Sequence, residues 1–416
     1  MTGADMKITA VRTFLMQAGP SNSGKPPRQI IPVVDESQPR LPGSRNWLFV
    51  KVETDAGITG IGECSGWPRV IERAIEDLSS LLIGEDPTHI ERIAQKLQVA
   101  MMGHGMLGTV GGGALTGIDI ALWDIKGKAL GTPVWNLLGG RVRDRVQIYT
   151  HANNKEFALS AKTRGFKAIK CSGGSGLQDP VRKVATMREL LGSDVDIAVD
   201  VHGPPWLTPI DAARLARALE PYDILWLEDP IAPDNLDGYK RIRDASTVPL
   251  AAGERVSGIF GERELIEKEL VDIIQPDAGR AGGITQMKKI AAMAEAHHIA
   301  VAPHSGSLGP VAEYAALHLM ASIPNALMLE RMEDDWEGRR QTIVPHPEQA
   351  DGFLTVPDAP GLGCDIVEAF IAGFPSQGNV SVPSKTLDDR DRIGGEGRLY
   401  VQTRLRRGKY FNAGDE

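Results

Sequence analysis

The sequence predicts an α/β barrel that follows a smaller mixed domain, and three features support this. From about residue 146, short apolar segments alternate with amphipathic helical segments, as in parallel strands joined by right-handed crossovers. There are eight such strands with seven helical connections, enough to close into a barrel. Successive strands also end in ionisable residues. A doubly wound open sheet is the alternative architecture.

The first 140 residues have a different pattern, which predicts a separate domain at 1–140. Residues 7–12 and 47–53 alternate apolar and polar side chains as strands do, and the turn sequence DAG follows the second. Segment 18–45 between them is rich in Pro, Gly and Ser, so we expect a long loop that is either a functional lid or disordered. Residues 69–135 have the apolar spacing of helices.

The remaining chain is expected to hold the barrel at 141–345 and a C-terminal segment at 346–416. The expected strands are VQIYTHA, AIKCS, DIAVDVH, ILWLEDP, LAAGE, DIIQPDA, AVAPHS and LMLERM. After Met332 the chain becomes polar and rich in turns, with no eighth long helix before it. We therefore expect 346–416 to return toward the N-terminal domain and to end in a polar tail.

Composition and charge exclude several classes of protein. The 416 residues are 42% hydrophobic, which suffices for a sizeable core. The net charge of −8 without a large basic block argues against a nucleic-acid partner. Runs of about 18 apolar residues and a signal peptide are lacking, so we expect no membrane partner. The three cysteines are odd in number and widely spaced, which favours a reducing, cytoplasmic location.

Ionisable residues recur at the ends of the expected strands. From the first of them onward they are 28, 26, 23, 27 and 26 residues apart, about one strand–helix unit each time. The C-terminal ends of barrel strands meet at one mouth, so these residues are expected to form a ring there. One such residue alone would be explained as a helix cap or a surface charge. The six are Asp200, Glu228, Glu254, Asp277, His304 and Glu330.

Three of these acids are expected to bind a metal ion. Asp200, Glu228 and Glu254 end adjacent strands, whose backbones lie about 4.8 Å apart. Ionised carboxylates at that spacing repel one another unless a cation lies between them. All-oxygen ligation favours a hard ion, and Mg²⁺ leaves coordination positions for water and substrate. A metal-free carboxylate cluster, calcium and manganese remain as alternatives.

Asp277 and His304 end neighbouring strands and form a candidate catalytic pair. An aspartate beside an imidazole fixes its tautomer and raises its basicity, which would make His304 a general base. The alternative is a structural histidine that is hydrogen-bonded to Asp277.

Two further residues are expected to face the same site. His202 lies two residues after Asp200, so strand alternation places both on one face, where His202 can reach a substrate. Lys170 shares a face with Ser172 at the end of AIKCS, and it is a candidate cation for a substrate carboxylate. The alternatives are a supporting role for His202 and a surface position for Lys170.

The ordered set of strand-end residues, with the strings DVHGPP, WLEDP, AAGER, QPDAGRAGGIT and APHSG, resembles the enolase superfamily. The stretch ALTGIDIALWDIKGKALGTPVWNLLGG at 114–140 is similar to that family's junction between capping domain and barrel. The likeness covers roughly 6–375 and is to the mandelate racemase subgroup. It implies a modified TIM barrel, (β/α)7β, beneath an α+β capping domain built from both ends of the chain. It also implies a homo-oligomer.

The resemblance implies a chemistry as well. Members of this superfamily use a Lys or His base with Mg²⁺ to stabilise an enediolate. Racemases of the subgroup have a Lys-x-Lys pattern at the end of the second barrel strand. Here Ser172 stands in place of the second lysine, which disfavours racemase activity. The combination of Asp200-x-His202 with Asp277 and His304 resembles galactonate dehydratase-type enzymes instead.

By this resemblance we expect a hydro-lyase that converts an aldonate or aldarate into a 2-keto-3-deoxy acid. One Mg²⁺ per subunit, with Mn²⁺ as substitute, would bind the substrate carboxylate. His304 would remove the C2 proton with Asp277 orienting it, and His202 would protonate the leaving C3 hydroxyl. Lys170 and Glu330 would hold the carboxylate and enediolate oxygens. The alternatives are an epimerase or racemase, a lactone cycloisomerase, and a non-catalytic binding protein.

Overall fold

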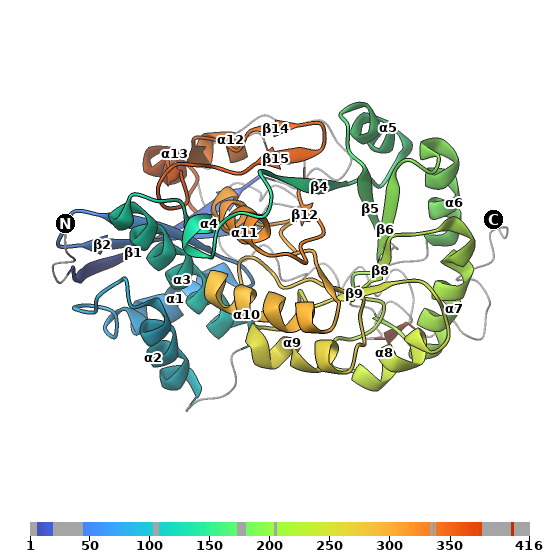
Figure 1. Cartoon of the computed structure of the whole chain (residues 1–416), viewed down its shortest axis with the longest axis horizontal. Coiled ribbons are helices and arrows are strands. Elements are labelled where there is room, and N and C mark those ends of the chain that lie inside the picture. Colours follow the sequence, from blue (N-terminus) through green and yellow to red (C-terminus); the bar gives the residue numbers. More distant parts are fainter. Residues whose placement is uncertain are drawn as a thin grey trace, which may run out of the picture.

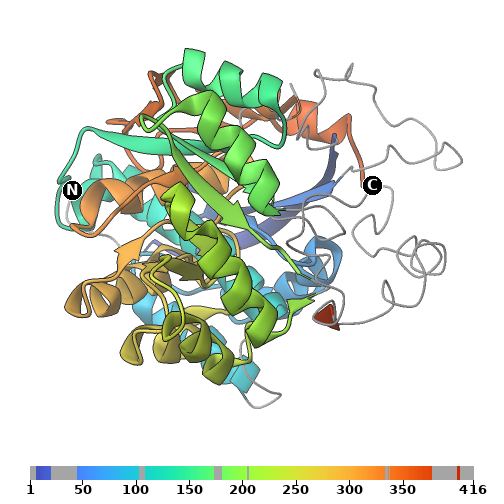
Figure 2. The same ribbon diagram turned by 90° about the vertical axis from the view of Figure 1, so that its right-hand side faces the viewer.

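The computed structural model consists of a capping domain beside a barrel (Figure 1). Figure 2, turned by 90°, shows barrel helices in front and the blue capping strands behind them. Most of the expected loop at 18–45 and most of the C-terminal tail lie outside the described residues. None of the helices in the described part of the chain is long and apolar enough to cross a membrane. The described residues are 6–19, 45–102, 108–172, 180–203, 206–332, 336, 338–376 and 401–402.

The capping domain begins with an antiparallel sheet in the order β1-β2-β3. Its strands are β1 (Ile8–Ala18), β2 (Arg45–Thr54) and β3 (Thr59–Cys64). The sequence pattern predicted the first two strands and the turn but not β3, because glycines weaken a strand signal. In the structure, Gly60 and Gly62 allow close packing, since a Cβ at either position would collide with backbone carbonyls of the helix beneath.

The N-terminal part of the cap also contains, among its described residues, the helices α1 (Pro68–Ser79), α2 (Ile90–Met102), α3 (Thr109–Leu130) and α4 (Val134–Leu137). Helix α3 is buried on almost every side, because it packs against β3 and against a barrel helix. It ends at Gly131, whose left-handed backbone (φ 65°) lets its N–H reach the carbonyls of Gly127 and Lys128.

In the described part of the chain, eight parallel strands and seven helices form the barrel, as the sequence predicts. The strands are β4 (Arg145–His151), β5 (Ala168–Ser172), β6 (Asp196–Asp200), β8 (Trp226–Glu228), β9 (Leu250–Ala252), β10 (Ile273–Ile274), β11 (Ala300–Val301) and β12 (Leu329–Glu330). The helices are α5 (Lys155–Thr163), α6 (Pro180–Leu191), α7 (Pro209–Leu219), α8 (Leu236–Arg243), α9 (Gly258–Glu267), α10 (Gly283–Ala296) and α11 (Pro310–Ser322).

The strands close into a barrel, which excludes the open doubly wound sheet. Neighbouring strands run in the order β11-β10-β9-β8-β6-β5-β4, and β12 pairs with β4 on the far side. The ring is completed beside β11, where Val301 N–H donates to Asn325 O at 2.9 Å and Leu327 N–H donates to Val301 O at 2.8 Å. The predicted (β/α)7β barrel with its capping domain is therefore confirmed.

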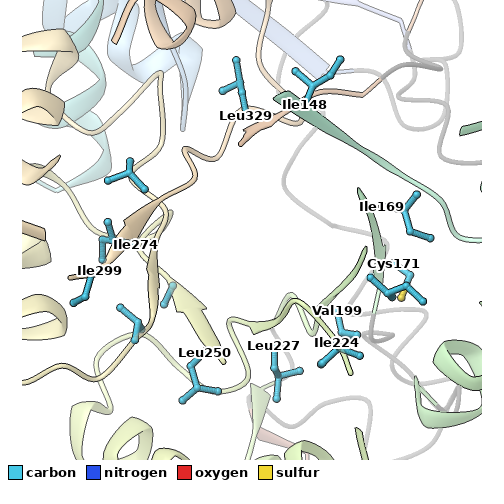
Figure 3. Close-up of a cluster of buried hydrophobic side chains, with 14 of the residues drawn as sticks. Ile148, Ile169, Cys171, Val199, Ile224, Leu227, Leu250, Ile274, Ile299 and Leu329 are labelled. Atoms are coloured by element: carbon cyan, nitrogen blue, oxygen red, sulfur yellow. The ribbon is translucent and has the colours of Figure 1, made fainter. Parts of the chain in front are cut away.

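Alternation along the strands separates the core from the site. Figure 3 shows Ile169, Val199 and Leu227 among the apolar side chains that surround the ring of strands. One residue further along each strand come Lys170, Asp200 and Glu228, whose side chains contact one another instead. The apolar positions hold the helices in place, and the polar positions in between are gathered inside the ring.

The C-terminal segment contacts both parts of the molecule. Strand β15 (Phe353–Thr355) pairs with β14 (Gln349–Ala350) and with β4 of the barrel. Helix α13 (Glu368–Ala372) contacts β1 of the cap. The remaining elements are β7 (Trp206–Leu207), η1 (Glu220–Tyr222), α12 (Gly338–Thr342), β13 (Ile343–Val344), β16 (Asp365–Ile366) and β17 (Val401–Gln402). The domain boundaries at 140 and 345 stay predictions.

Candidate active site

The register of the barrel strands places two of the expected metal ligands side by side. Asp200 on β6 is the pairing partner of Glu228 on β8. Glu254 lies two residues beyond the end of β9, the next strand in the ring. All three carboxylates are buried. The spacing that the sequence suggested therefore corresponds to three acids at or just beyond the ends of adjacent strands.

Lys170 lies among the carboxylates. Its Nζ is 2.7 Å from Glu228 Oε1, 2.7 Å from Glu330 Oε1 and 3.7 Å from Asp200 Oδ2. Burial alone would lower the pKa of Lys170, but the charges of Glu228 and Glu330 outweigh it and hold that pKa well above its usual value. Lys170 is thus a permanent cation of the site.

Glu228 is fixed by two further donors that the sequence analysis did not single out. Trp226 Nε1 and Gln275 Nε2 each donate to Glu228 Oε2 at 2.9 Å. Trp226 lies two residues before Glu228 on the same strand, so strand alternation would have placed both on one face. Gln275 directly follows β10, and no spacing rule connects it to Glu228.

The carboxylate oxygens of these three acids suit a hard cation, although the side chains do not converge on one position in this structure. Among the residues that the structure describes, no group of three His, Cys, Asp or Glu side chains is arranged to hold a metal ion. Protein cations contact the acids instead: Lys170 as above, and Arg255, whose NH2 lies 2.9 Å from Glu254 Oε1. Yet Asp200 Oδ1 is buried without a hydrogen-bond partner in the described structure. A ligand oxygen in that state fits a divalent ion.

The electrostatics of Asp200 also favour an added cation. Its pKa lies well above the ordinary value, first because of burial and second because of the charge of Glu228. Lys170 opposes this effect only in part. An ion with two positive charges between these acids would favour their ionised forms.

Asp277 and His304 form the expected pair. His304 Nδ1 is 2.6 Å from Asp277 Oδ2 within a buried setting. Burial alone would raise the pKa of Asp277, but Arg280, whose NH2 is 3.3 Å away, and the hydrogen bond from His304 hold that pKa below its ordinary value. Asp277 is therefore an ionised acceptor that keeps the Nδ1 proton of His304 in place.

The other imidazole nitrogen of His304 faces the acids. Nε2 is 2.9 Å from Glu254 Oε2 and 3.7 Å from Glu330 Oε2. Burial would lower the pKa of His304, but the carboxylates of Glu254 and Glu330 raise it well above its usual value. In this arrangement His304 is an imidazolium whose Nε2 lies beside an expected metal ligand.

Glu330 is saturated with donors, which makes it an anchor of the site. Its Oε1 accepts from Lys170 and lies 2.6 Å from His151 Nε2. Its Oε2 accepts from the backbone N–H groups of Ser305 and Gly306 at 2.9 and 2.8 Å. His151 was not predicted as a site residue, although it ends the first barrel strand as the other candidates end theirs.

His202 has an unusual backbone and a changed environment. Strand β6 ends at Asp200, and His202 has a left-handed backbone (φ 50°), which is rare for a non-glycine residue and common at functional sites. Strand alternation therefore does not extend to it, but its Nδ1 still lies 3.6 Å from Asp200 Oδ2.

The proton on His202 is set by its neighbours. Arg255 NH2 lies 3.3 Å from His202 Nδ1, which makes that nitrogen an acceptor. Desolvation lowers the pKa of His202 to about 4. The charge of Glu254 opposes this shift, and the charge of Arg255 adds to it. Its side chain is 58% exposed, so water weakens this effect. Near pH 7 His202 is nevertheless neutral in this arrangement.

Comparison with known proteins identifies the family. Residues 42–139 match the mandelate racemase/muconate lactonizing enzyme N-terminal domain, and residues 154–370 match the enolase C-terminal domain-like family. A D-galactonate dehydratase of Ralstonia pickettii is 37% identical over 355 residues, which is 80% of this chain and 91% of the relative. The chain belongs to the enolase superfamily, in its mandelate racemase/muconate lactonizing enzyme family.

Solved structures agree with this assignment. An enolase from Pantoea ananatis, with bound D-gluconate and Mg, has a TM-score of 0.78 and 32% identity, covering 90% of this chain and 96% of that one. The 3,6-anhydro-D-galactonate cycloisomerase of Zobellia galactanivorans has a TM-score of 0.78 and 31% identity, covering 89% and 99%. The expected superfamily is confirmed, and the curated relatives confirm the expectation of an enzyme, a carbon–oxygen lyase.

Proposed function

We propose that this enolase-superfamily member dehydrates a sugar acid, an aldonate or aldarate, to a 2-keto-3-deoxy acid in a Mg²⁺-dependent reaction. One observation carries the proposal: two histidines contact the expected metal ligands, His304 beside Glu254 and His202 beside Asp200. A substrate whose carboxylate is held by a metal ion at those acids would lie within reach of both histidines. The dehydratase names of the curated relatives support the same chemistry.

The metal site is assigned to Asp200, Glu228 and Glu254. When bound there, Mg²⁺ supplies positive charge that attracts the substrate carboxylate and offsets the negative charge that develops as the C2 proton leaves. Manganese, a hard ion of similar preference, is the expected substitute. Lys170 Nζ lies 2.7 Å from Glu228 Oε1, a contact that orients this carboxylate.

His304 is assigned as the base. The C2–H bond breaks and its proton passes to Nε2, while Asp277 holds the proton on Nδ1 at 2.6 Å. Nε2 must first lose its own proton, which the negative charge of Glu254 stabilises in the present arrangement. A cation bound to Glu254 would weaken this stabilisation.

His202 is assigned as the acid. The C3–O bond breaks, and the hydroxyl leaves as water with a proton from His202; the resulting enol then tautomerises to the keto acid. Because its pKa is lowered to about 4, His202 must gain a proton when the anionic substrate binds beside it. Arg255, which faces Nδ1, leaves Nε2 as the donor toward substrate.

Lys170 is assigned to the oxygens of the substrate carboxylate, whereas Glu330, which was expected to share this role, is assigned a supporting one. Lys170 is a donor with a fixed charge. Glu330 is already occupied by four donors, so we assign it to orienting Lys170 and the imidazole of His304, which lies 3.7 Å away.

The test is a screen of mono- and diacid sugars with Mg²⁺ for 2-keto acid formation, in H₂O and in D₂O. With the substrate found, His304→Asn is expected to lose both dehydration and C2 exchange by at least about 10²-fold. His202→Asn is expected to lose dehydration while keeping C2 exchange. His89→Asn, an exposed cap position, is the matched control and should keep full activity. Keto-acid formation that persists in His304→Asn contradicts the assignment.

A different outcome of the same proton abstraction is the second candidate. The similarity to a cycloisomerase is as high as that to the gluconate-bound enolase, with a TM-score of 0.78 in both comparisons. Two histidines near one substrate also suit a two-base epimerisation. Deuterium incorporation at C2 or ring closure without loss of water would favour this candidate.

A further inference from the structure

A serine of the capping domain touches the catalytic pair of the barrel. Ser65 directly follows β3 and is buried. Its hydroxyl donates to Asp277 Oδ1 at 2.6 Å, and Asp277 Oδ2 is in turn 2.6 Å from His304 Nδ1. One carboxylate therefore links the cap to the proposed base.

The backbone around this contact is held tightly. Ser65 N–H donates to Gly279 O at 2.8 Å, and Gly279 N–H donates to Asp277 Oδ1 at 2.8 Å. A Cβ at Gly279 would lie 2.7 Å from Ser65 Cβ, so only glycine allows this approach. On the other side, a Cβ at Gly113 of α3 would lie 2.8 Å from Ser65 O. Ser65 is thus fixed between the capping helix and the loop after β10.

The Ser65 hydroxyl also stabilises the negative charge of Asp277, which the residues of the barrel alone would stabilise less well. Asp277 is fully buried, and each oxygen of a buried carboxylate requires donors. On Oδ1 these donors are Ser65 and the Gly279 N–H, and Ser65 is the only side chain among the described residues that donates there. Without Ser65 the carboxylate can rotate, and rotation moves Oδ2 away from His304 Nδ1.

We propose that Ser65 is a positioning residue for His304: it holds the Asp277 carboxylate at the rotation that aims the imidazole at C2. The inference rests on the proposed function for the identity of the base. It makes the capping domain a contributor to proton transfer, in addition to covering the barrel. Mutation of a residue that orients a functional side chain through an intermediate hydrogen bond typically changes activity by about 10- to 100-fold.

The kinetic test compares Ser65→Ala with Thr116→Val. Thr116 makes another hydrogen bond between cap and barrel, since its Oγ1 accepts from Gly282 N–H at 2.8 Å, but it does not touch Asp277. Ser65→Ala is expected to lower kcat by about 10- to 100-fold with little change in KM. The primary isotope effect of a C2-deuterated substrate should rise, because proton transfer becomes slower. Thr116→Val should change neither quantity.

A double mutant separates positioning from general stability. In an Asp277→Asn background the carboxylate that Ser65 holds is gone, so Ser65→Ala should add less than about twofold to the loss. Additive losses would overturn the proposal. Ser65→Cys, with a weaker donor of similar size, carries the same test if Ser65→Ala does not fold, and it should give an intermediate loss.

A spectroscopic test works without any substrate. In protein labelled with ¹⁵N-histidine, the Nδ1–H resonance of His304 is identified by its loss in His304→Asn. We expect Ser65→Ala to shift or broaden this resonance and Thr116→Val to leave it in place. An unmoved resonance in Ser65→Ala overturns the proposal even if no sugar acid is turned over, so failure of the proposed function and failure of this inference remain distinguishable.

Discussion

At the scale of single residues, Lys170 balances the charge inside the barrel. Its ammonium group contacts Glu228, Glu330 and Asp200, and only 2% of the residue is exposed. Taking so many charges out of water is favourable only when each finds a partner. Lys170 is therefore the internal counter-ion that lets the acids of the site be buried together.

Removal of this counter-ion should destabilise the protein in a way that magnesium reverses. Lys170→Met is expected to lower the free energy of unfolding by about 3–5 kcal/mol, because the buried carboxylates lose their cation. Mg²⁺ should restore part of this loss by binding Asp200 and Glu228. Urea unfolding with and without Mg²⁺ measures both effects.

Lys128→Met is the matched control for that experiment. Lys128 Nζ lies 2.6 Å from Asp124, a buried acid of the capping domain that is not part of the candidate site. This variant should also lose stability, but Mg²⁺ should stabilise it no more than wild type, because its candidate metal site is unchanged. A Mg²⁺-induced gain that is no larger in Lys170→Met than in Lys128→Met would contradict this role of Lys170.

At the scale of elements, close packing of β3 on α3 determines the position of the cap residues that contact the barrel. Strand β3 carries Glu63, whose Oε2 accepts from Ala312 N–H at 2.9 Å and whose Oε1 accepts from Gly309 N–H at the start of α11. The same strand leads into Ser65. A shift of β3 on α3 would therefore displace contacts to two barrel loops at once.

Gly62→Ala tests this close packing. A Cβ at Gly62 would overlap the backbone carbonyl of Gly117 in α3, which cannot move aside as a flexible side chain would. We expect a loss of about 3 kcal/mol in the free energy of unfolding, at the upper end for overpacked positions. Gly108→Ala is the control: no described atom lies within 4 Å of a Cβ there, so the loss should stay below about 1 kcal/mol. Similar losses in the two variants would refute the role of the contact.

At the scale of the whole molecule, cap, barrel and C-terminal segment share a hydrophobic cluster. Trp47 and Phe49 of β2 pack in it with Val311 and Tyr314 of α11 and with Phe374, which lies just after α13. His318 lies at the same junction: its Nδ1 accepts from Trp135 N–H of α4 at 3.2 Å, and its Nε2 donates to Leu362 O at 3.0 Å. The parts should therefore unfold together.

The buried His318 makes this junction sensitive to acid. Burial lowers the pKa of His318 from 6.5 to about 4. A histidine with a depressed folded pKa contributes stability above the unfolded pKa, and that stability is lost as pH falls from about 6.5 through about 4. The loss attributable to His318 is about 3 kcal/mol over this window.

The measurement is the free energy of unfolding of wild type and His318→Gln between pH 4 and 8. Carboxylates titrate in the same window in both proteins, so the difference between the two curves isolates the histidine. We expect the stability gap to be constant above pH 7 and to narrow as the pH falls. Parallel curves over the whole range would exclude this role of His318.

Much of this protein could be predicted from local patterns. Alternation with period two and the spacing of about one strand–helix unit identify the barrel strands and the residues that end them, because both properties depend only on neighbours along the chain. For that reason Asp200, Glu228, Asp277 and His304 could be expected at one mouth. His151 was equally accessible to this reasoning and was overlooked.

Other features depend on how distant segments dock, and only the tertiary structure decided them. The pairing of Gln275 with Glu228, the contact of Ser65 with Asp277 and the position of Lys170 among three acids join residues that are 30 to 212 positions apart. Such contacts follow from closure of the barrel and from glycines that admit a close backbone approach, and neither leaves a periodic signal. The sequence by itself determined most of the ionisable groups that follow the barrel strands, whereas closure of the barrel and docking of the cap decided which of them contact one another.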